Sequence, residues 1–208
     1  HLEHRRQRQM CIRDSSKIAI IGSSGSGKSS LLNIASLLQN PRLGDIFIMG
    51  KNAARLKDNE RSLLRKKNIG YIHQQNSLLM EFTAFENIYI TLLLNGFNAS
   101  YAKERAYELL ELVNLKERAM HKPSALSGGE QQRVAIVRAI SNSPEIIIAD
   151  EPTGNLDKIN SDNVINELLN ISSINKTSLL LATHDLTIAK KMDKIYILND
   201  GSLLEYKE

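Results

Sequence analysis

A glycine-rich segment between a short apolar run and an amphipathic helix pattern constrains the fold most strongly. Residues 22–29 read Gly-Ser-Ser-Gly-Ser-Gly-Lys-Ser. The apolar run Lys17–Ile21 before them predicts a short strand, and apolar residues recur at helical spacing over Ser29–Leu38 after them. Strand, glycine turn and helix in this order match the phosphate-binding pattern G-x-x-x-x-G-K-[ST]. The sequence therefore predicts an α/β core with a phosphate site at the end of a strand.

Each residue type in this segment suits contact with a polyphosphate. Glycines let backbone N–H groups turn inward, and the start of a helix adds positive potential. Lys28 would neutralise the β- and γ-phosphates of a nucleotide such as ATP, and the hydroxyl of Ser29 would bind Mg²⁺. The candidate nucleotide-binding residues here are Gly22, Ser23, Ser24, Gly25, Ser26, Gly27, Lys28, Ser29 and Ser30.

A second apolar strand ends in two adjacent carboxylates. Ile146–Asp150 is followed directly by Glu151. Ligands of open α/β sheets bind at the carboxyl ends of the strands, where these side chains would lie. We expect Asp150 to hold Mg²⁺ through water and Glu151 to act as general base on the attacking water.

A third motif, Leu126–Gln132, reads Leu-Ser-Gly-Gly-Glu-Gln-Gln. Ser127 and the amides of Gly128 and Gly129 would stand at a helix start and form a second anion site. With the two earlier motifs, this heptapeptide resembles the signature of the ABC ATPases. The resemblance implies an ATPase that uses ATP and Mg²⁺ and pairs head to tail. Each signature then covers the γ-phosphate bound by the other subunit.

Three further residues stand where the resemblance implies functional positions. A lone glutamine or histidine is more often structural, but here the order along the chain agrees with the family. Gln74 resembles the glutamine that senses γ-phosphate and Mg²⁺ and faces a membrane partner. Asp157 lies in a segment similar to the loop that crosses the dimer seam, and His184 resembles the histidine that contacts γ-phosphate.

Longer strings resemble one branch of the family. Ala149–Asp157 is similar to the branch of lipoprotein-releasing, MacB-type efflux and FtsE-like ATPases, and Leu78–Asn87 and His121–Pro123 are most similar to the lipoprotein-releasing members. The resemblance implies a homodimer bound to integral membrane permease subunits at the cytoplasmic face of a bacterial inner membrane. It further implies that the transporter releases lipoproteins from that membrane.

Two alternatives stay open. The first is the ATPase of a MacB-type efflux or FtsE-like cell-division complex. The second is a soluble ABC ATPase that acts on DNA or ribosomes. The spacing from Gln74 to Ser127 is 53 residues (127 − 74), which is short and transporter-like. DNA-acting members carry very long insertions there, so the second alternative is disfavoured.

The amino-acid composition argues against several classes of protein. Hydrophobic residues make up 42% and charged residues 24% of the chain, as in ordinary globular proteins. No apolar run reaches the roughly 18 to 20 residues that a membrane-spanning helix needs. The net charge is +4, the lysines and arginines are scattered apart from one cluster at the N-terminus, and aromatics make up only 5%. We therefore expect no direct membrane span and no nucleic-acid partner.

The pattern of elements changes twice along the chain. From about Asn76 to Ser141 it is helical, and Thr83 with Glu86 forms a capping box at the start of one helix. Strand patterns return at Ile146–Asp150, Ser178–Thr183 and Lys194–Asn199. The fold class expected is a P-loop core of mostly parallel sheet flanked by helices, spanning 16–208, with an inserted helical subdomain at about 76–141.

The first fifteen residues have neither helical nor strand periodicity. Met10–Asp14 can be encoded by a string that matches an adapter used in DNA library preparation, so we expect 1–15 to be non-native or disordered. The segment holds four arginines, two acidic residues and the only cysteine, Cys11; without it the net charge falls from +4 to +2. No aromatic residue precedes Lys28 to stack on adenine, which predicts that N-terminal strands are missing. We expect ATP binding to be roughly 5- to 150-fold weaker as a result.

Overall fold

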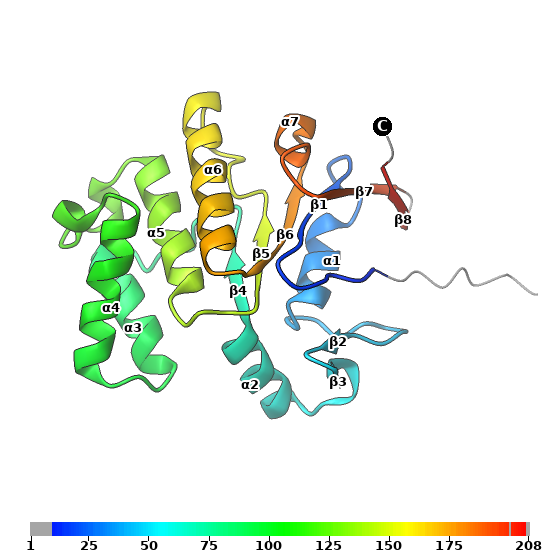
Figure 1. The fold of residues 1–208 in the computed structure, drawn as a ribbon, viewed down its shortest axis with the longest axis horizontal. Coiled ribbons are helices and arrows are strands. Elements are labelled where there is room, and N and C mark those ends of the chain that lie inside the picture. Colours follow the sequence, from blue (N-terminus) through cyan, green and yellow to red (C-terminus); the bar gives the residue numbers. More distant parts are fainter. Residues whose placement is uncertain (1–9, 200, 207–208) are drawn as a thin grey trace, which may run out of the picture.

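Six strands form the central sheet of the computed structural model, which describes residues 10–199 and 201–206 (Figure 1). They are β1 (Lys17–Ile21), β4 (Ile69–Ile72), β5 (Ile146–Asp150), β6 (Ser178–Thr183), β7 (Lys194–Asn199) and β8 (Ser202–Glu205). Their order is β4-β5-β6-β1-β7-β8, and every pair is parallel except β7 with β8. The expected mostly parallel sheet is confirmed.

The parallel strands β1, β4, β5 and β6 are largely buried on both faces, as the strands of parallel sheets are. Successive residues of a strand point to opposite faces, so each strand serves two apolar clusters. Ile147 and Leu181 belong to the cluster that includes the helices on one face, whereas Ile148 and Leu180 belong to the cluster around Leu32 on the other. All six residues of β6 are buried, which explains why its sequence is almost continuously apolar.

Helices cover both faces and one end of the sheet. They are α1 (Lys28–Ala35), α2 (Asp58–Asn68), α3 (Ala84–Leu94), α4 (Ala99–Leu112), α5 (Gly128–Ile140), α6 (Lys158–Ile174) and α7 (Leu186–Ala189). Short 3₁₀ turns occur at η1 (Ala53–Arg55), η2 (Lys116–Arg118) and η3 (Pro123–Ala125). Between β4 and β5 the described chain is helical, and α3, α4 and α5 stand together beside the β4 edge (Figure 1).

The expected capping box at Thr83 is present. The Thr83 amide donates to Glu86 Oε2 at 2.8 Å, and the Glu86 amide donates to Thr83 Oγ1 at 3.1 Å. Among the described residues, no helix combines the length and apolar character that crossing a membrane requires.

Several expected elements differ in extent. Alternation over Gly44–Met49 predicts a strand there, but the structure has only β2 (Phe47–Ile48), which pairs with β3 (Lys51–Asn52) in a separate sheet. The sequence from Asp185 to Met192 predicts a helix, but α7 has only four residues. The sequence reading also missed β8, whose residues 202–205 are too few for a clear alternation.

Of the segment 1–15, which is predicted to be non-native, residues 1–9 lie outside the described residues. Met10 and Ile12 pack against the apolar cluster around Leu32. The Arg13 carbonyl accepts hydrogen bonds from the Ser16 amide and from the Ser178 hydroxyl, both at 3.1 Å. The foreign origin of the segment stays a prediction.

Candidate functional site

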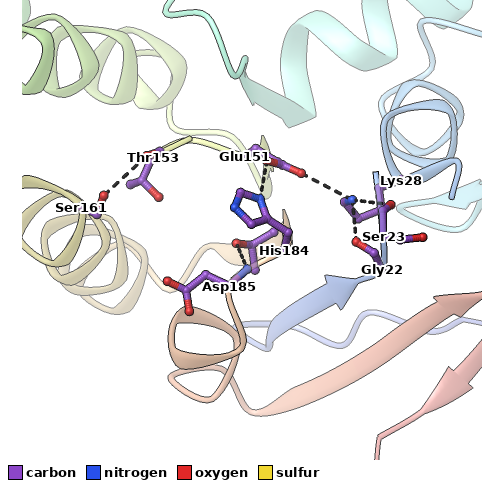
Figure 2. A network of polar contacts seen from close by, with 9 residues as sticks. Gly22, Ser23, Lys28, Glu151, Thr153, Ser161, His184 and Asp185 are labelled. Atoms are coloured by element: carbon purple, nitrogen blue, oxygen red, sulfur yellow. Dashed lines mark hydrogen bonds and ion pairs between the residues drawn. The ribbon is translucent and has the colours of Figure 1, made fainter. Parts of the chain in front are cut away.

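Three parallel neighbouring strands bring the first motifs to one edge of the sheet. β1 leads into Gly22, β5 leads into Glu151, and β6 leads into His184. The register pairs Ile21 with Thr183 and Asp150 with Ala182, so the three strands end level with one another. Segments more than 120 residues apart in sequence therefore meet where the carboxyl ends of the strands converge (Figure 2).

The glycine-rich turn needs its glycines for two reasons. Gly25 and Gly27 have φ angles of 79° and 97°, in the left-handed region that side chains disfavour. A Cβ on Gly22 would lie 2.6 Å from the carbonyl oxygen of Leu198. Gly27 is also the N-cap of α1, so the turn delivers free amides and the positive end of the helix to one place.

Lys28 crosses this turn with its charge already paired. Its side chain is only 6% exposed, and Nζ donates to the carbonyl oxygens of Gly22 at 2.9 Å and Ser23 at 3.1 Å. Nζ also lies 3.4 Å from Glu151 Oε1 (Figure 2). Ser29 and Ser30 follow on the exposed side of α1. The lysine Nζ therefore lies in the glycine-rich turn, where a phosphate oxygen could replace the Glu151 carboxylate as its partner.

Glu151 bridges the lysine to the histidine. Its Oε2 lies 2.8 Å from His184 Nδ1, while Oε1 faces Lys28 (Figure 2). Glu151 has a φ of 44°, a conformation that costs a non-glycine residue of order 1–3 kcal/mol and is common at functional sites. Its amide donates to the Ala182 carbonyl at 2.9 Å, which holds the carboxylate at the end of β6.

Hydrogen bonds next to His184 fix its loop. The Asp185 amide donates to the buried Thr183 hydroxyl at 3.0 Å, and Asp185 Oδ1 accepts from the Thr187 amide at 2.7 Å. Burial alone would raise the pKa of Asp185, but hydrogen bonds from Thr187 and Ile188 to its carboxylate hold the pKa below its ordinary value. Asp185 therefore stays ionised and holds the loop that carries His184 against the start of α7.

A cavity of about 290 Å³ adjoins this pair and is lined in part by Glu151, Thr153, Thr183 and His184. A water molecule occupies about 30 Å³ in the liquid, so the cavity has room for several waters beside Glu151.

Asp150 has the geometry expected of a group that serves a cation. Its Oδ1 is buried and has no hydrogen-bond partner, and such an orphaned carboxylate oxygen is costly unless a ligand satisfies it. The described residues contain no cluster of three or more His, Cys, Asp or Glu for a metal. Mg²⁺ fits such a sparse site, because it binds one or two protein oxygens and keeps several waters beside substrate phosphates.

Gln74 reaches the same place from β4. A Cβ on Gly154 would lie 3.2 Å from Gln74 Nε2 and 3.6 Å from Glu151 Oε2, so the amide and the carboxylate flank one small space. The structure thus brings together Lys28, Gln74, Asp150, Glu151 and His184, all of which were candidates from the sequence.

The signature residues form a second cluster at the start of α5. Ser127 is the N-cap, and its amide donates to Glu130 Oε2 at 2.7 Å while the Glu130 amide donates to Ser127 Oγ at 3.3 Å. The bond from the Ser127 backbone holds the pKa of Glu130 below its ordinary value. Ser127 and Gly128 are exposed at this helix start.

The second cluster includes the start of α6. A Cβ on Gly128 would lie 3.3 Å from Leu156 Cδ2, and one on Gly129 would lie 3.4 Å from Asn160 Oδ1. Asp157 caps α6 by accepting from the Asn160 amide at 3.0 Å, and this bond lowers its pKa. The signature glycines therefore pack against the loop that contains Asp157.

Sequence reasoning missed Glu130 and Asp185 as residues that shape these loops. The S-x-x-E pattern of a capping box was visible at Ser127 and could have found Glu130. Asp185 is the N-cap of α7, and an aspartate directly before an expected helix could have identified it, whereas its contact with Thr183 could not be read from the sequence.

Comparisons with known proteins identify the family. The profile of the ABC transporter family matches residues 6–154. The chain belongs to the ABC transporter family. It is 46% identical to the lipoprotein-releasing system ATP-binding protein LolD of Hyphomonas neptunium over 191 residues, which are 92% of this chain and 84% of the relative. It is 48% identical to LolD of Blochmanniella floridana over 89% of this chain and 79% of the relative.

Among solved structures, it resembles the dimeric post-hydrolysis state of the ATP-binding cassette MJ0796 bound to ADP and Pi. The TM-score is 0.86 and the identity 35%, over 95% of this chain and 88% of that one. The chain is therefore an ATP-binding subunit of an ABC transporter, and the family implies that it hydrolyses ATP.

Proposed function

We propose that this ABC ATPase drives the release of lipoproteins from the bacterial inner membrane. The observation that carries this is its likeness to relatives named LolD, at 42–48% identity over about four fifths or more of their length. In this proposal the chain lies at the cytoplasmic face of that membrane and acts as the motor of a translocase.

The proposed chemistry assigns one task to each group at the sheet edge. Lys28 leaves Glu151 and neutralises the β- and γ-phosphates of ATP. Ser29, Asp150 and Gln74 hold Mg²⁺, which supplies charge stabilisation to the transferred phosphoryl group. Glu151 then takes the proton of the attacking water, and His184 contacts the γ-phosphate while its Nδ1 remains near Glu151. The products are ADP and phosphate.

The proposed site is completed by a second copy of the chain. Ser127, Gly128 and Gly129 of one subunit cover the γ-phosphate at the P-loop of the other, and Asp157 lies at the seam. The exposed helix start supports this proposal, because Ser127 and Gly128 face solvent at the positive end of α5, which suits an anion from outside the chain.

A mixing experiment tests the head-to-tail arrangement. Lys28→Ala and Ser127→Arg should each lose ATPase activity alone, since every site of either homodimer lacks one part. In a mixture, the heterodimer pairs an intact P-loop with an intact signature, and activity should partly return. A mixture as inactive as either variant alone would exclude sites shared between subunits.

The proposed partner is an integral membrane permease. We propose that the helical subdomain, residues 76–141, and the Gln74 loop transmit closure of the dimer to it. The test is to reconstitute the chain with the membrane proteins encoded beside it and to measure the release of a labelled lipoprotein from proteoliposomes to a soluble acceptor. ATP-dependent release that Glu151→Gln abolishes would support the proposal. Export of a drug instead, without lipoprotein release, would favour an efflux ATPase.

A further inference from the structure

The segment that follows Gln74 is bonded to one face of α5. Asn76 Nδ2 donates to Gln131 Oε1 at 3.2 Å. Arg138 donates from one guanidinium nitrogen to the Ser77 carbonyl at 2.9 Å and from another to the Asn76 carbonyl at 3.2 Å. Gln131 and Arg138 are seven residues apart, about two helical turns, so both lie on the face of α5 that meets this segment.

The amide of Gln131 also reaches the approach to the signature. Its Nε2 donates to the carbonyl oxygens of Pro123 at 2.9 Å and Leu126 at 3.1 Å. Leu126 immediately precedes Ser127. A single side chain therefore contacts both the second residue after Gln74 and the residue before the signature serine.

These bonds lie in a partly buried environment. Gln131 and Asn76 are half-buried, and burial lowers the pKa of the Arg138 guanidinium. Both donors and the acceptor of the Gln131 amide are used, so a shift of either segment would leave a sheltered polar group unpaired, which costs more than the bond contributes. The two segments are thus held in fixed positions relative to α5.

We propose that Gln131 is a positioning residue that couples the Gln74 loop to the signature turn. Asn76 bonds this loop to Gln131, and Arg138 holds the loop against α5. Contact of Gln74 with the nucleotide bound in its own subunit then sets the position of Ser127 toward the nucleotide of the other subunit. Coupling between two positions is reciprocal, so a signature turn seated on the partner's nucleotide also orders the Gln74 loop. The functional part of this inference rests on the proposed shared sites; the bonded connection does not.

Hydrogen exchange tests the connection in the isolated protein without nucleotide. In Asn76→Ala, the amides of residues 124–128 should exchange about 3- to 10-fold faster, although they lie about fifty residues away. In Gln131→Ala, the amides of residues 75–78 should exchange faster as well. Gln75→Ala is the matched control, an exposed neighbour that should leave 124–128 unchanged. An effect of Asn76→Ala confined to its own loop would overturn the inference.

Kinetics test what the connection does. Asn76→Ala and Gln131→Ala should each lower kcat by about 3- to 10-fold and leave KM for ATP within about twofold, because the P-loop contacts are intact. The double variant should be no slower than the slower single variant, since one interaction is removed twice. Gln131→Glu keeps the acceptor for Asn76 but loses the donor to Leu126, so it should match Gln131→Ala.

The outcomes separate this inference from the proposed function. Additive losses, or a raised KM with unchanged kcat, would overturn the coupling even in an active dimer. Absence of shared-site activity in the mixing experiment would remove the proposed function, while hydrogen exchange would still decide whether Gln131 connects the two loops.

Discussion

Replacing Glu151 by glutamine should separate binding from turnover. The Glu151 carboxylate lies 3.4 Å from Lys28 Nζ, with side-chain exposures of 17% and 6%, so little solvent screens the pair. A hydrogen bond to a charged group in such a place contributes about 1.5–3 kcal/mol. ATP must displace this contact in the wild type but not in Glu151→Gln, so the variant should bind Mg-ATP roughly 10- to 150-fold more tightly. Loss of the general base should lower kcat by about 10²–10⁴-fold.

Equilibrium binding of a fluorescent ATP analogue gives the first quantity, and single-turnover phosphate release gives the second. Glu145→Gln is the matched control, because Glu145 is an exposed glutamate at the opposite end of β5 and should change neither. Unchanged affinity in Glu151→Gln would mean that the Lys28 pair does not oppose ATP binding. Turnover within tenfold of the wild type would refute Glu151 as the base.

Three further predictions concern substitutions of single residues. Asp150→Asn should raise the Mg²⁺ concentration for half-maximal ATPase activity about 10- to 100-fold after chelator treatment, and an unchanged titration curve would remove Asp150 from the metal site. Gly70→Ala would place a Cβ against the backbone of Ala139, so urea unfolding should show a loss of about 3 kcal/mol or more, and stability near wild type would contradict this packing. The Ser127 backbone holds the pKa of Glu130 below its ordinary 4.5. The ionised carboxylate therefore adds to the free energy of unfolding above about pH 4.5, and this contribution is lost as pH falls through the folded-state pKa. The stability difference between wild type and Glu130→Gln should therefore shrink between pH 7 and about pH 3.5; a constant difference would argue against the capping box.

Local patterns predicted the strands of the core well. Lys17–Ile21, Ile146–Asp150, Ser178–Thr183 and Lys194–Asn199 match β1, β5, β6 and β7 residue for residue. They are strongly apolar because the sheet is covered on both faces, and such runs leave little ambiguity. In contrast, β2 and β3 have two residues each, and their pairing depends on a turn at Gly50 with a φ of 74° that no periodicity reveals.

The candidate site was predictable where one short motif carries the chemistry. The residues from Gly22 to Ser29 and the pair Asp150 and Glu151 could be assigned roles from type and spacing alone. The contact between Glu151 and His184 could not, because it joins residues 33 apart that meet only when β5 and β6 pair in register. The same reason hid Gln131, whose partner Asn76 lies 55 residues before it in the chain and is close to it only in the folded state.

The starts of α1 and α5, which the proposed function assigns to the same γ-phosphate, differ in their hydrogen bonding. At α1, the cation Lys28 is already paired with Glu151 and with two carbonyl groups of its own turn, so a nucleotide enters by exchange. At α5, Ser127 accepts a hydrogen bond from the Glu130 amide, and a hydroxyl that accepts in this way still has a proton to donate. That exposed donor stands at the positive end of a helix and suits an anion arriving from outside the chain. The proposed shared site, with one start of each kind, would have both the charge and the directional donors that a γ-phosphate requires, and two copies of the chain would supply it twice.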